Sequence, residues 1–478
     1  MSNPSTKPYD AIVIGSGPNG FAAAITIARA GRSVLIVEAK DTVGGGMRSA
    51  ELTLPGFVHD VCSAIHPLAS SSPFFRSVPL KDHGLEFIHP GAPLAHPFED
   101  GRVVMLERSI DETTARLGED AAAYRKLVEP LVRRAEPLFH ELLGPFRPPR
   151  SPLLMARFGM NAIRSAHGLA SSKFRGDLAR AFFAGNAAHS VMPLERSVTA
   201  AIGIILLVNG HAIGWPVARG GSQKIADALA SYFRSIGGTI ETNRPIASLD
   251  HLPPAKAYLF DTSPKQLARI AADALPDRFL AKLQKYRYGP GVFKLDWALS
   301  APIPWKNPEC ARAATVHVGG TLDEIAASER AAWSNKPSDR PFVLVAQQSL
   351  FDPTRAPAGK HTGWGYCHVP NGDTTDMTDA IESQIERFAP GFRDTILARH
   401  KMSSADFQSY NANYIGGDIN GGVQDVMQLF TRPTVRINPY TTPNKQIYIC
   451  SASTPPGGGV HGMGGYFGAK AALSRALR

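Results

Sequence analysis

The chain has 478 residues, of which 44% are hydrophobic and 19% charged, an ordinary composition for a globular protein. Its length suits two or three domains and allows a large core without disulfides or a structural metal. The formal net charge of +10 would suit an anionic partner, but no nucleic-acid-binding motif accompanies it, so we expect no nucleic acid.

The cysteines are widely separated, at Cys62, Cys310, Cys367 and Cys450. They form no CxxC pair, which excludes disulfide-reductase chemistry, and they match no zinc pattern. The histidines are scattered, so we expect no metal site. This cysteine usage indicates free, mostly buried thiols in a reducing compartment, and we expect a cytoplasmic protein.

Two segments bear on whether the chain carries a leader sequence or a membrane-spanning helix. Residues 1–8 are polar and lead directly into a strand, so we expect no signal peptide. The longest apolar run, 200–208, is shorter than the roughly 20 residues of a membrane-spanning helix and predicts a buried helix.

The N-terminal region has the pattern of one βαβ unit. Residues 10–14 are a β-branched run that predicts a strand, and 33–38 predict a second strand. Between them, 20–30 predict a helix that Gly31 closes.

The remaining elements follow in chain order. From about 110 to 214 the chain is mainly helical, with helices over 111–117, 121–143 and 197–208 and a break at the proline-rich 144–152. Further helices are expected at 222–236, from 266 onward, and at 323–332, 378–388 and 466–477. The expected strands are 239–242, 246–249, 258–261, 292–297, 342–347, 363–368 and 446–451.

A GxGxxG motif connects the first strand to its helix. It consists of Gly15, Ser16, Gly17, Pro18, Asn19 and Gly20. The first glycine permits the tight turn, the second lets the backbone approach a pyrophosphate, and the third lets the helix pack closely on the sheet. The helix N-terminus then directs free N–H groups and the positive end of its dipole at the phosphates.

Glu38 ends the second strand, where a carboxylate can accept hydrogen bonds from ribose hydroxyls. It would also repel a 2′-phosphate, which argues against NADP. Glu38 and Ala39 are followed by a second glycine run, which places bare backbone and one cation near the dinucleotide. This run and its extension comprise Gly44, Gly45, Gly46, Met47 and Arg48.

With this extension the sequence resembles the two-dinucleotide-binding-motif flavoproteins, which include amine oxidases, protoporphyrinogen oxidase and phytoene desaturases. The resemblance implies FAD as the cofactor. The stretch 214–246 is similar to another segment of the same superfamily, which implies that backbone near Ile246 meets the adenine.

The C-terminal region carries a third glycine-rich loop, which includes Gly457, Gly458, Gly459, His461, Gly462 and Met463. Residues 457–462 are formally another GxGxxG, but no strand or acidic residue follows before Arg478, so we expect no second nucleotide site. The loop resembles the flavin motif of bacterial-type phytoene desaturases. That resemblance implies that the following helix N-terminus faces the flavin pyrimidine and stabilises its reduced, anionic form.

Together these segments predict an α/β fold: a Rossmann-like FAD-binding domain with an inserted α+β substrate domain of mixed sheet plus helices. The FAD-binding domain is expected to comprise 1–100, 215–270 and 425–478. The insert is expected to have a mainly helical part, 101–214, and a second part, 271–424. It resembles the phytoene-dehydrogenase-like group in layout alone.

The predicted activity is that of an FAD-dependent dehydrogenase or desaturase, in which an apolar or semi-polar organic substrate gives a hydride to flavin N5. With one dinucleotide fold, we expect re-oxidation by oxygen, a quinone or a partner protein. The resemblance places residues 56–67 near the isoalloxazine, where Asp60, Ser63 and His66 could meet the substrate or the flavin. The candidate catalytic residues are Asp60, His66 and His461, and no base is assigned.

Four other side chains are expected to be structural: His189, His211, Tyr440 and Tyr466. Residues 151–180 interleave apolar side chains with cations, a pattern that suits peripheral contact with an anionic membrane or a solvated helical face over the substrate cavity. Two other functions stay open, a flavin amine oxidase of the same fold and a non-catalytic flavin-binding module. The oligomeric state is not predicted.

Overall fold

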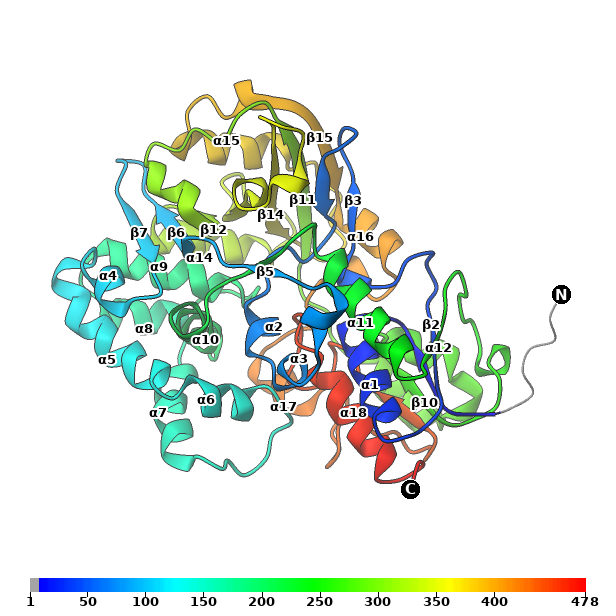
Figure 1. Ribbon diagram of the computed structural model, residues 1–478. Coiled ribbons are helices and arrows are strands. Elements are labelled where there is room, and N and C mark those ends of the chain that lie inside the picture. Colours follow the sequence, from blue (N-terminus) through cyan, green and yellow to red (C-terminus); the bar gives the residue numbers. More distant parts are fainter. Residues whose placement is uncertain (1–7) are drawn as a thin grey trace.

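A computed structural model describes residues 8–478, and the chain is built around two large sheets (Figure 1). The prediction about a leader at 1–8 falls largely on residues 1–7, which lie outside the described part. One sheet is parallel and brings the N- and C-terminal segments together, and the other is larger and mixed. The predicted fold class, a Rossmann-like α/β domain with an inserted mixed-sheet domain, is therefore confirmed.

The parallel sheet has five strands in the order β16-β10-β1-β2-β9, so segments far apart in the sequence pair as neighbours. The last strand of the chain, β16, completes the sheet beside β10. The bounds are β1 (Tyr9–Ile14), β2 (Val34–Val37), β9 (Thr239–Glu241), β10 (Ala255–Phe260) and β16 (Ile447–Ile449).

Helices cover both faces of this sheet, because a parallel sheet buries side chains on each side. In β1, Ala11 and Val13 belong to one core, whereas Ile12 and Ile14 belong to another. Helices α1, α11 and α18 pack on the first face, and α1 and α18 lie side by side (Figure 1). Helices α12 and α13 pack on the second. The bounds are α1 (Pro18–Ala28), α11 (Gln223–Ser235), α12 (Pro264–Ile270), α13 (Asp277–Gln284) and α18 (Met463–Leu473).

The insert contains the second sheet, with seven strands in the order β15-β11-β14-β13-β12-β6-β7. Neighbouring strands are antiparallel except for the parallel pair of β12 and β6. The bounds are β6 (Ala92–Pro97), β7 (Val103–Leu106), β11 (Gly291–Leu299), β12 (Ala313–Val318), β13 (Val343–Ala346), β14 (His361–Val369) and β15 (Ile396–Met402).

The two faces of this second sheet differ in chemistry. The outer face packs Trp297 and its apolar neighbours against α15 (Thr378–Phe388). We call the opposite side the inner face. It packs against residues 58–66 and against the helices α9 (Asp177–Ala188), α10 (Thr199–Ala212) and α14 (Leu322–Ala331). Because side chains alternate along a strand, this face carries Lys294 and Asp296 of β11 and Tyr366 and His368 of β14.

Residues 110–212 are mainly helical, as expected, but the single helix predicted over 121–143 is wrong. It is divided at Arg133 and Arg134, because Pro137 has no amide hydrogen and is tolerated in the first turn of a new helix. The bounds are α4 (Ile110–Thr114), α5 (Ala121–Val132), α6 (Ala135–Leu142), α7 (Pro152–Ala162), α8 (Ala166–Lys173), α9 (Asp177–Ala188) and α10 (Thr199–Ala212). Helix α10 is largely buried, as its apolar run predicted.

The strand predicted over 246–249 is also wrong, since these residues form no ladder and lead into a short 3-10 turn, Leu249–His251. Several short elements had no clear sequence signal. They are β3 (Ser49–Glu51), β4 (Val58–Asp60), β5 (Phe87–Ile88), β8 (Val217–Ala218), α2 (Pro67–Ser71), α3 (Pro73–Arg76), α16 (Ser404–Tyr410) and α17 (Val426–Thr431).

The two sheets also show where the chain passes from one domain to the other. Strand β6 joins the insert's sheet from Ala92 onward, ahead of the boundary predicted at residue 100. Helix α13 packs with α12, so the second segment of the parallel-sheet domain extends beyond residue 270.

The basic stretch 151–180 forms α7, α8 and the first turn of α9 instead of one continuous amphipathic helix. On α7, Leu153 and Met160 are largely exposed, whereas Leu154 and Phe158 are buried. Membrane contact here stays a prediction. Within residues 8–478, no helix has the length and apolar character to cross a bilayer.

Candidate dinucleotide site

The first glycine motif forms a tight turn between β1 and α1. Gly15 has a φ of +100°, and a side chain at Gly20 would overlap the carbonyl oxygen of Gly15. Gly17 is the N-cap of α1, and the Asp261 carboxylate accepts a hydrogen bond from the backbone N–H of Gly20 in the first turn. A glycine N-cap places no side-chain atoms of its own at this end of α1, where the motif predicts a phosphate.

The second glycine run lies directly against the first. An ideal Cβ at Gly45 would stand 3.0 Å from the Cα of Gly17, so the two loops meet backbone to backbone. Ser16 joins them, because the backbone N–H of Gly44 donates to its carbonyl oxygen at 3.1 Å. Met47 is buried at the end of this run and packs into the apolar core.

The buried Glu38 carboxylate holds this arrangement. It accepts hydrogen bonds from the backbone N–H of Ser16 at 3.0 Å, from its hydroxyl at 2.5 Å and from the backbone N–H of Lys40 at 3.0 Å. The Arg48 guanidinium lies 3.1 Å from it and donates to the carbonyl oxygen of Thr42 at 2.7 Å. Arg48 is thus placed on the Glu38 side of the turn.

The third glycine loop brings the C-terminus to the same place. A side chain at Gly465 would overlap the carbonyl oxygen of Asn19, so α18 packs directly on the first turn of α1. Asn19 also accepts a hydrogen bond from the backbone N–H of Gly465 at 3.3 Å. The N-cap of α18 is Gly462, at a φ of +68°, and the side chains of Asn19 and His461 accept hydrogen bonds from N–H groups of the first turn.

These three loops suit an elongated anionic cofactor. The N-termini of α1 and α18, each with a glycine N-cap, lie together, and the backbone there packs so closely that added Cβ atoms would clash. Helix N-termini direct the positive end of the helix dipole at phosphate. Ala39 and Ile246 lie at the Glu38 end, because the backbone N–H of Arg244 donates to the carbonyl oxygen of Glu38 at 2.9 Å.

Two groups of side chains at this site were not predicted from the sequence. Tyr410 donates to the carbonyl oxygen of Gly45 at 3.1 Å, and Tyr414 lies against Gly46, yet both belong to the insert and carry no local signal. Asp261 follows β10 directly and accepts a hydrogen bond from the backbone N–H of Gly20 at 2.8 Å. A carboxylate at the end of a strand next to β1 is a signal that could have been used.

Asp261 is a buried acid, and burial with the nearby Glu38 raises its pKa to about 7, against the opposing effect of the Gly20 and Gly17 hydrogen bonds. An acid whose folded pKa is raised loses stability as pH rises through that pKa. We therefore expect Asp261→Asn to stabilise the chain at pH 8 by up to about 4 kcal/mol and to have little effect at pH 4.

Urea unfolding between pH 4 and pH 8 measures this difference. The control is Asp10→Asn, because Asp10 pairs with Lys256, which with Ser33 lowers its pKa, and its contribution is lost only in acid. Equal slopes of stability against pH for the wild type and Asp261→Asn would contradict the assignment.

In the structure the three candidate catalytic residues form hydrogen bonds within the protein, and one atom, Nδ1 of His66, is buried without a partner. Asp60 accepts from Ser49 and from the backbone N–H of Ser222, both at 2.7 Å, and pairs with Arg355 at 2.6 Å. Burial opposes ionisation, yet Arg355 and these hydrogen bonds hold the Asp60 pKa below its usual range. Asp60 therefore forms a junction between β4 and the turn Pro353–Arg355.

The two candidate histidines are neutral, and a hydrogen bond fixes the position of each ring. The backbone N–H of Met463 donates to Nδ1 of His461 at 3.1 Å, so Nε2 carries the hydrogen and donates to the carbonyl oxygen of Gly457. His66 Nε2 lies 2.9 Å from the Ser222 hydroxyl. Burial lowers the pKa of both rings to about 4. His461 thus shapes the glycine loop that contains Gly458 and Gly459.

Nearby polar side chains divide between the loops and the core. Ser63 donates to the carbonyl oxygen of Gly46 at 2.8 Å. Tyr440 donates to the carbonyl oxygen of Pro455 at 3.0 Å and stacks on Phe467. His211 contacts the Tyr124 hydroxyl at 2.7 Å, and both side chains are buried. These contacts suit the structural role expected for Tyr440 and His211. Tyr466 packs edge-on against Phe467.

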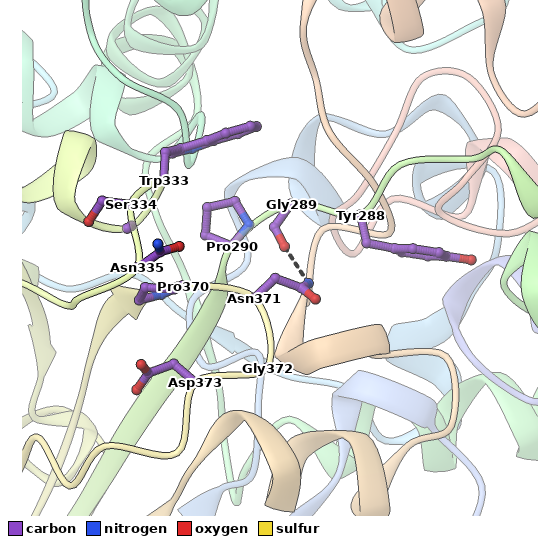
Figure 2. Close-up of a pocket in the computed structure, with 11 residues that line it drawn as sticks. Tyr288, Gly289, Pro290, Trp333, Ser334, Asn335, Pro370, Asn371, Gly372 and Asp373 are labelled. Atoms are coloured by element: carbon purple, nitrogen blue, oxygen red, sulfur yellow. Dashed lines mark hydrogen bonds between the residues drawn. The ribbon is translucent and has the colours of Figure 1, made fainter.

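A separate hollow of about 430 Å³ opens on the insert, at the ends of α14 and β14 (Figure 2). Asn371 donates to the carbonyl oxygen of Gly289 at 2.6 Å across its floor. The four cysteines are unpaired. Among residues 8–478 no cluster of three or more His, Cys, Asp or Glu side chains has the arrangement of a metal site.

Known proteins share both sequence and fold with this chain. Residues 13–78 match the family described as NAD(P)-binding Rossmann-like domain. The mouse (Mus musculus) pyridine nucleotide-disulfide oxidoreductase domain-containing protein 2 is 25% identical over 97% of this chain and 93% of its own. The phytoene dehydrogenase of Streptomyces griseus is 23% identical over 81% of this chain and 77% of its own.

Two solved structures superpose over almost the whole chain. An oxidoreductase from Methanosarcina mazei has a TM-score of 0.64 at 15% identity, covering 97% of this chain and 99% of its own. A wild-type putrescine oxidase bound to putrescine has a TM-score of 0.62 at 16% identity, covering 98% and 99%. Identities this low show the fold alone. The chain therefore has the fold of amine-oxidase-like oxidoreductases, with a Rossmann-like dinucleotide-binding domain and a mixed-sheet second domain.

Proposed function

We propose that this chain is an FAD-dependent oxidoreductase that removes a hydride from an organic substrate. The observation that carries the proposal is the meeting of three glycine loops at the N-termini of α1 and α18, both with glycine N-caps, next to the Glu38 carboxylate. When bound there, FAD supplies a two-electron acceptor at N5, and the protein supplies orientation and the exclusion of water.

Each loop has its own task in this proposal. The turn Gly15–Gly20 and the N-terminus of α1 bind the pyrophosphate, with Glu38 on the adenosine ribose. The loop at 457–462, shaped by His461, holds the N-terminus of α18 toward the flavin ring, where a partial positive charge favours the reduced anion. Tyr410 fixes the backbone of Gly45 from the insert side.

The finer assignment within this class rests on the relatives. Similarity to phytoene dehydrogenase extends over most of the chain, which supports a dehydrogenase or desaturase that acts on an apolar or semi-polar substrate. The fold shared with putrescine oxidase and with cyclohexylamine oxidase from Brevibacterium oxydans IH-35A supports a second candidate, an amine oxidase. Oxygen, a quinone or a partner protein would re-oxidise the flavin in either case.

The test is the absorbance spectrum of the purified full chain, followed by anaerobic photoreduction and admission of air or a quinone. We expect one FAD per chain and re-oxidation by one of these acceptors. Rapid peroxide formation with amines would select the amine-oxidase candidate. A bound flavin that no acceptor re-oxidises would indicate a non-catalytic flavin-binding module, and a colourless chain that does not take up FAD would refute the proposal.

A further inference from the structure

The inner face of the second sheet carries ionisable side chains where a packed core would carry apolar ones. Lys294 and Asp296 form a buried ion pair on β11, and His368 lies on β14. Buried charged and polar groups are costly unless each has a partner, so these positions need a reason other than packing. Lys294 pairs with Oδ2 of Asp296, whereas Oδ1 of Asp296 and one nitrogen of the His368 ring have no hydrogen-bond partner.

The unsatisfied atom of this ring is Nε2. Both carboxylate oxygens of Glu329, on α14, lie 2.9 Å from Nδ1 of His368, and the two side chains are buried. A carboxylate only accepts hydrogen bonds, so Nδ1 carries the hydrogen and donates it. In the neutral ring Nε2 then bears a lone pair, and this buried atom has no hydrogen-bond partner. A carboxylate that fixes the tautomer of a histidine in this way is the arrangement of a general base.

His368 lies on the inner face of the second sheet, the face that packs against residues 58–66 beside the dinucleotide site. Tyr366 is the next inward residue of β14, with its ring centre 5.7 Å from that of His368. Tyr366 and Ile65 pack against the same small cluster, and burial together with the neighbouring Cys62 and Glu329 raises the pKa of Tyr366. The residue after Cys62, Ser63, is hydrogen-bonded to Gly46 through its backbone and its side chain. Tyr366 thus neighbours both Glu329 and the segment that contacts the second glycine loop.

Other unsatisfied donors and local strain surround the pair. The indole N–H groups of Trp215 and Trp364 are buried without an acceptor. Val191, two residues after His189, has a φ of +52°, which is a strained conformation for a β-branched residue. Strain and unsatisfied polar atoms are typical of sites that a ligand completes.

The pair also lies close to an opening. The hollow in Figure 2 is lined by residues 332–335, which follow α14, and by 370–373, which follow β14. Glu329 is one helical turn before the first of these segments, and His368 is two residues before the second. Trp333 in the hollow donates to the carbonyl oxygen of Val191 at 3.1 Å, which connects this opening to the strained segment.

We propose that His368, positioned by Glu329, is the proton acceptor of the reaction and that the substrate is an alcohol or an amine with a hydrogen on the adjacent carbon. This inference rests on the proposed FAD-dependent function. The C–H bond would break, and its hydrogen would leave with both electrons to a bound FAD, the oxidant of the proposed function. The O–H or N–H bond breaks and its proton goes to Nε2 of His368. The electron pair left on oxygen or nitrogen forms the C=O or C=N bond, so the substrate is oxidised by two electrons.

A pH profile can report on this pair, because the neighbouring titratable groups stay uncharged and the charged Lys294 and Asp296 of the inner face pair with each other. His189, which follows α9, has its pKa lowered to about 3, chiefly by burial, and burial with His189 and His96 lowers that of His317 on β12 well below its usual value. Tyr366 and Cys62 have raised pKa values, chiefly through burial. A pH effect between pH 5 and pH 9 that a change at His368 removes therefore belongs to the pair.

The main experiment is anaerobic stopped-flow reduction of the FAD-loaded full chain by primary and secondary alcohols and amines, including cyclohexanol and cyclohexylamine. We expect the rate with the productive compound to rise with pH in the wild type. His368→Gln should lower it by about 100-fold or more and remove the pH dependence, with FAD content unchanged. The control His96→Gln removes another buried histidine of the same sheet, bonded to the carbonyl oxygen of Gly320, and should leave the rate unaltered.

Glu329 is tested as a positioning residue. Glu329→Gln keeps an acceptor for Nδ1–H but not the charge that favours the imidazolium ion, so the rate–pH curve should shift to lower pH. An independent readout is the ¹⁵N NMR signal of His368 in the FAD-free full chain, assigned by its loss in His368→Gln. We expect hydrogen on Nδ1 in the wild type and exchange between both nitrogens in Glu329→Leu.

Three results would overturn the inference while leaving the proposed function intact. They are a yellow, photoreducible chain that no alcohol or amine reduces, a full rate in His368→Gln, and hydrogen on Nε2 of His368 in the wild type. A chain that binds no flavin would instead refute the proposed function itself.

Discussion

Gly17→Val is expected to yield a folded but colourless protein, with FAD affinity lowered by at least about 100-fold, which corresponds to about 2.7 kcal/mol. The Cβ at this position would lie 2.6 Å from a carboxylate oxygen of Asp261, and the backbone of Gly45 lies so close to the Cα that even a Cβ on Gly45 would approach it to 3.0 Å. The valine must therefore extend into the remaining space in front of α1, where the pyrophosphate is proposed to bind. Absorbance of the protein after ultrafiltration measures the retained flavin.

The matched control for this change is Gly159→Val. Gly159 lies within α7, and nothing stands within 4 Å of an added Cβ. It should retain the wild-type flavin content. Glu38→Gln gives a second test that keeps the side-chain shape, and we expect weaker FAD binding because the ribose loses a charged acceptor. Stoichiometric FAD in Gly17→Val, with an unchanged melting temperature, would rule out pyrophosphate binding at this turn.

The second large effect concerns stability. Asp60→Ala or Arg355→Ala should each lower the free energy of unfolding by about 3–5 kcal/mol, because each leaves a buried charge without its partner. Arg355 donates to Asp60 at 2.6 Å and to the carbonyl oxygen of Val58 at 3.0 Å, and both charged side chains are about 1% exposed. Replacing both residues should lower the free energy of unfolding by less than the sum of the two single changes, because no buried charge is then left without a partner.

Urea unfolding of the four proteins of this double-mutant cycle measures the coupling. The Asp60 pKa is held below its usual range, so the pair's stabilisation is present above about pH 4 and is lost as pH falls through the folded pKa. The exposed pair of Lys336 and Asp339 is the control, and Asp339→Asn should change stability by less than about 0.5 kcal/mol. Strictly additive losses at Asp60 and Arg355 would show that the two residues act independently.

In the structure, Asp60 and His461 have structural contacts, whereas their positions in the sequence suggested a catalytic role. Both lie in segments that resembled flavin-contacting motifs, but their hydrogen bonds hold loops together. A residue type in a motif does not reveal which of its atoms are already engaged. That depends on partners such as Arg355, which is far away in the sequence and visible only in the folded chain.

Local chemistry explains which elements could be predicted. The unit β1–α1–β2 was correct because the strand pattern, the glycine turn and the helix end depend on neighbouring residues. The strand predicted at 246–249 failed because an apolar run does not by itself supply a partner strand. Helix α18 begins at Met463, ahead of the predicted start, because its glycines are required by close packing on Asn19.

The sequence by itself therefore determined the dinucleotide turn, the acid that follows it and the presence of an insert. These depend on short-range rules: glycine where the backbone must turn or approach, and a carboxylate at the end of a strand. The tertiary structure alone decided which groups meet. The three glycine loops converge because α18 packs on α1, and Glu329 meets His368 because α14 lies on the inner face of the second sheet. Such contacts depend on packing between segments far apart in the chain, which no local pattern encodes.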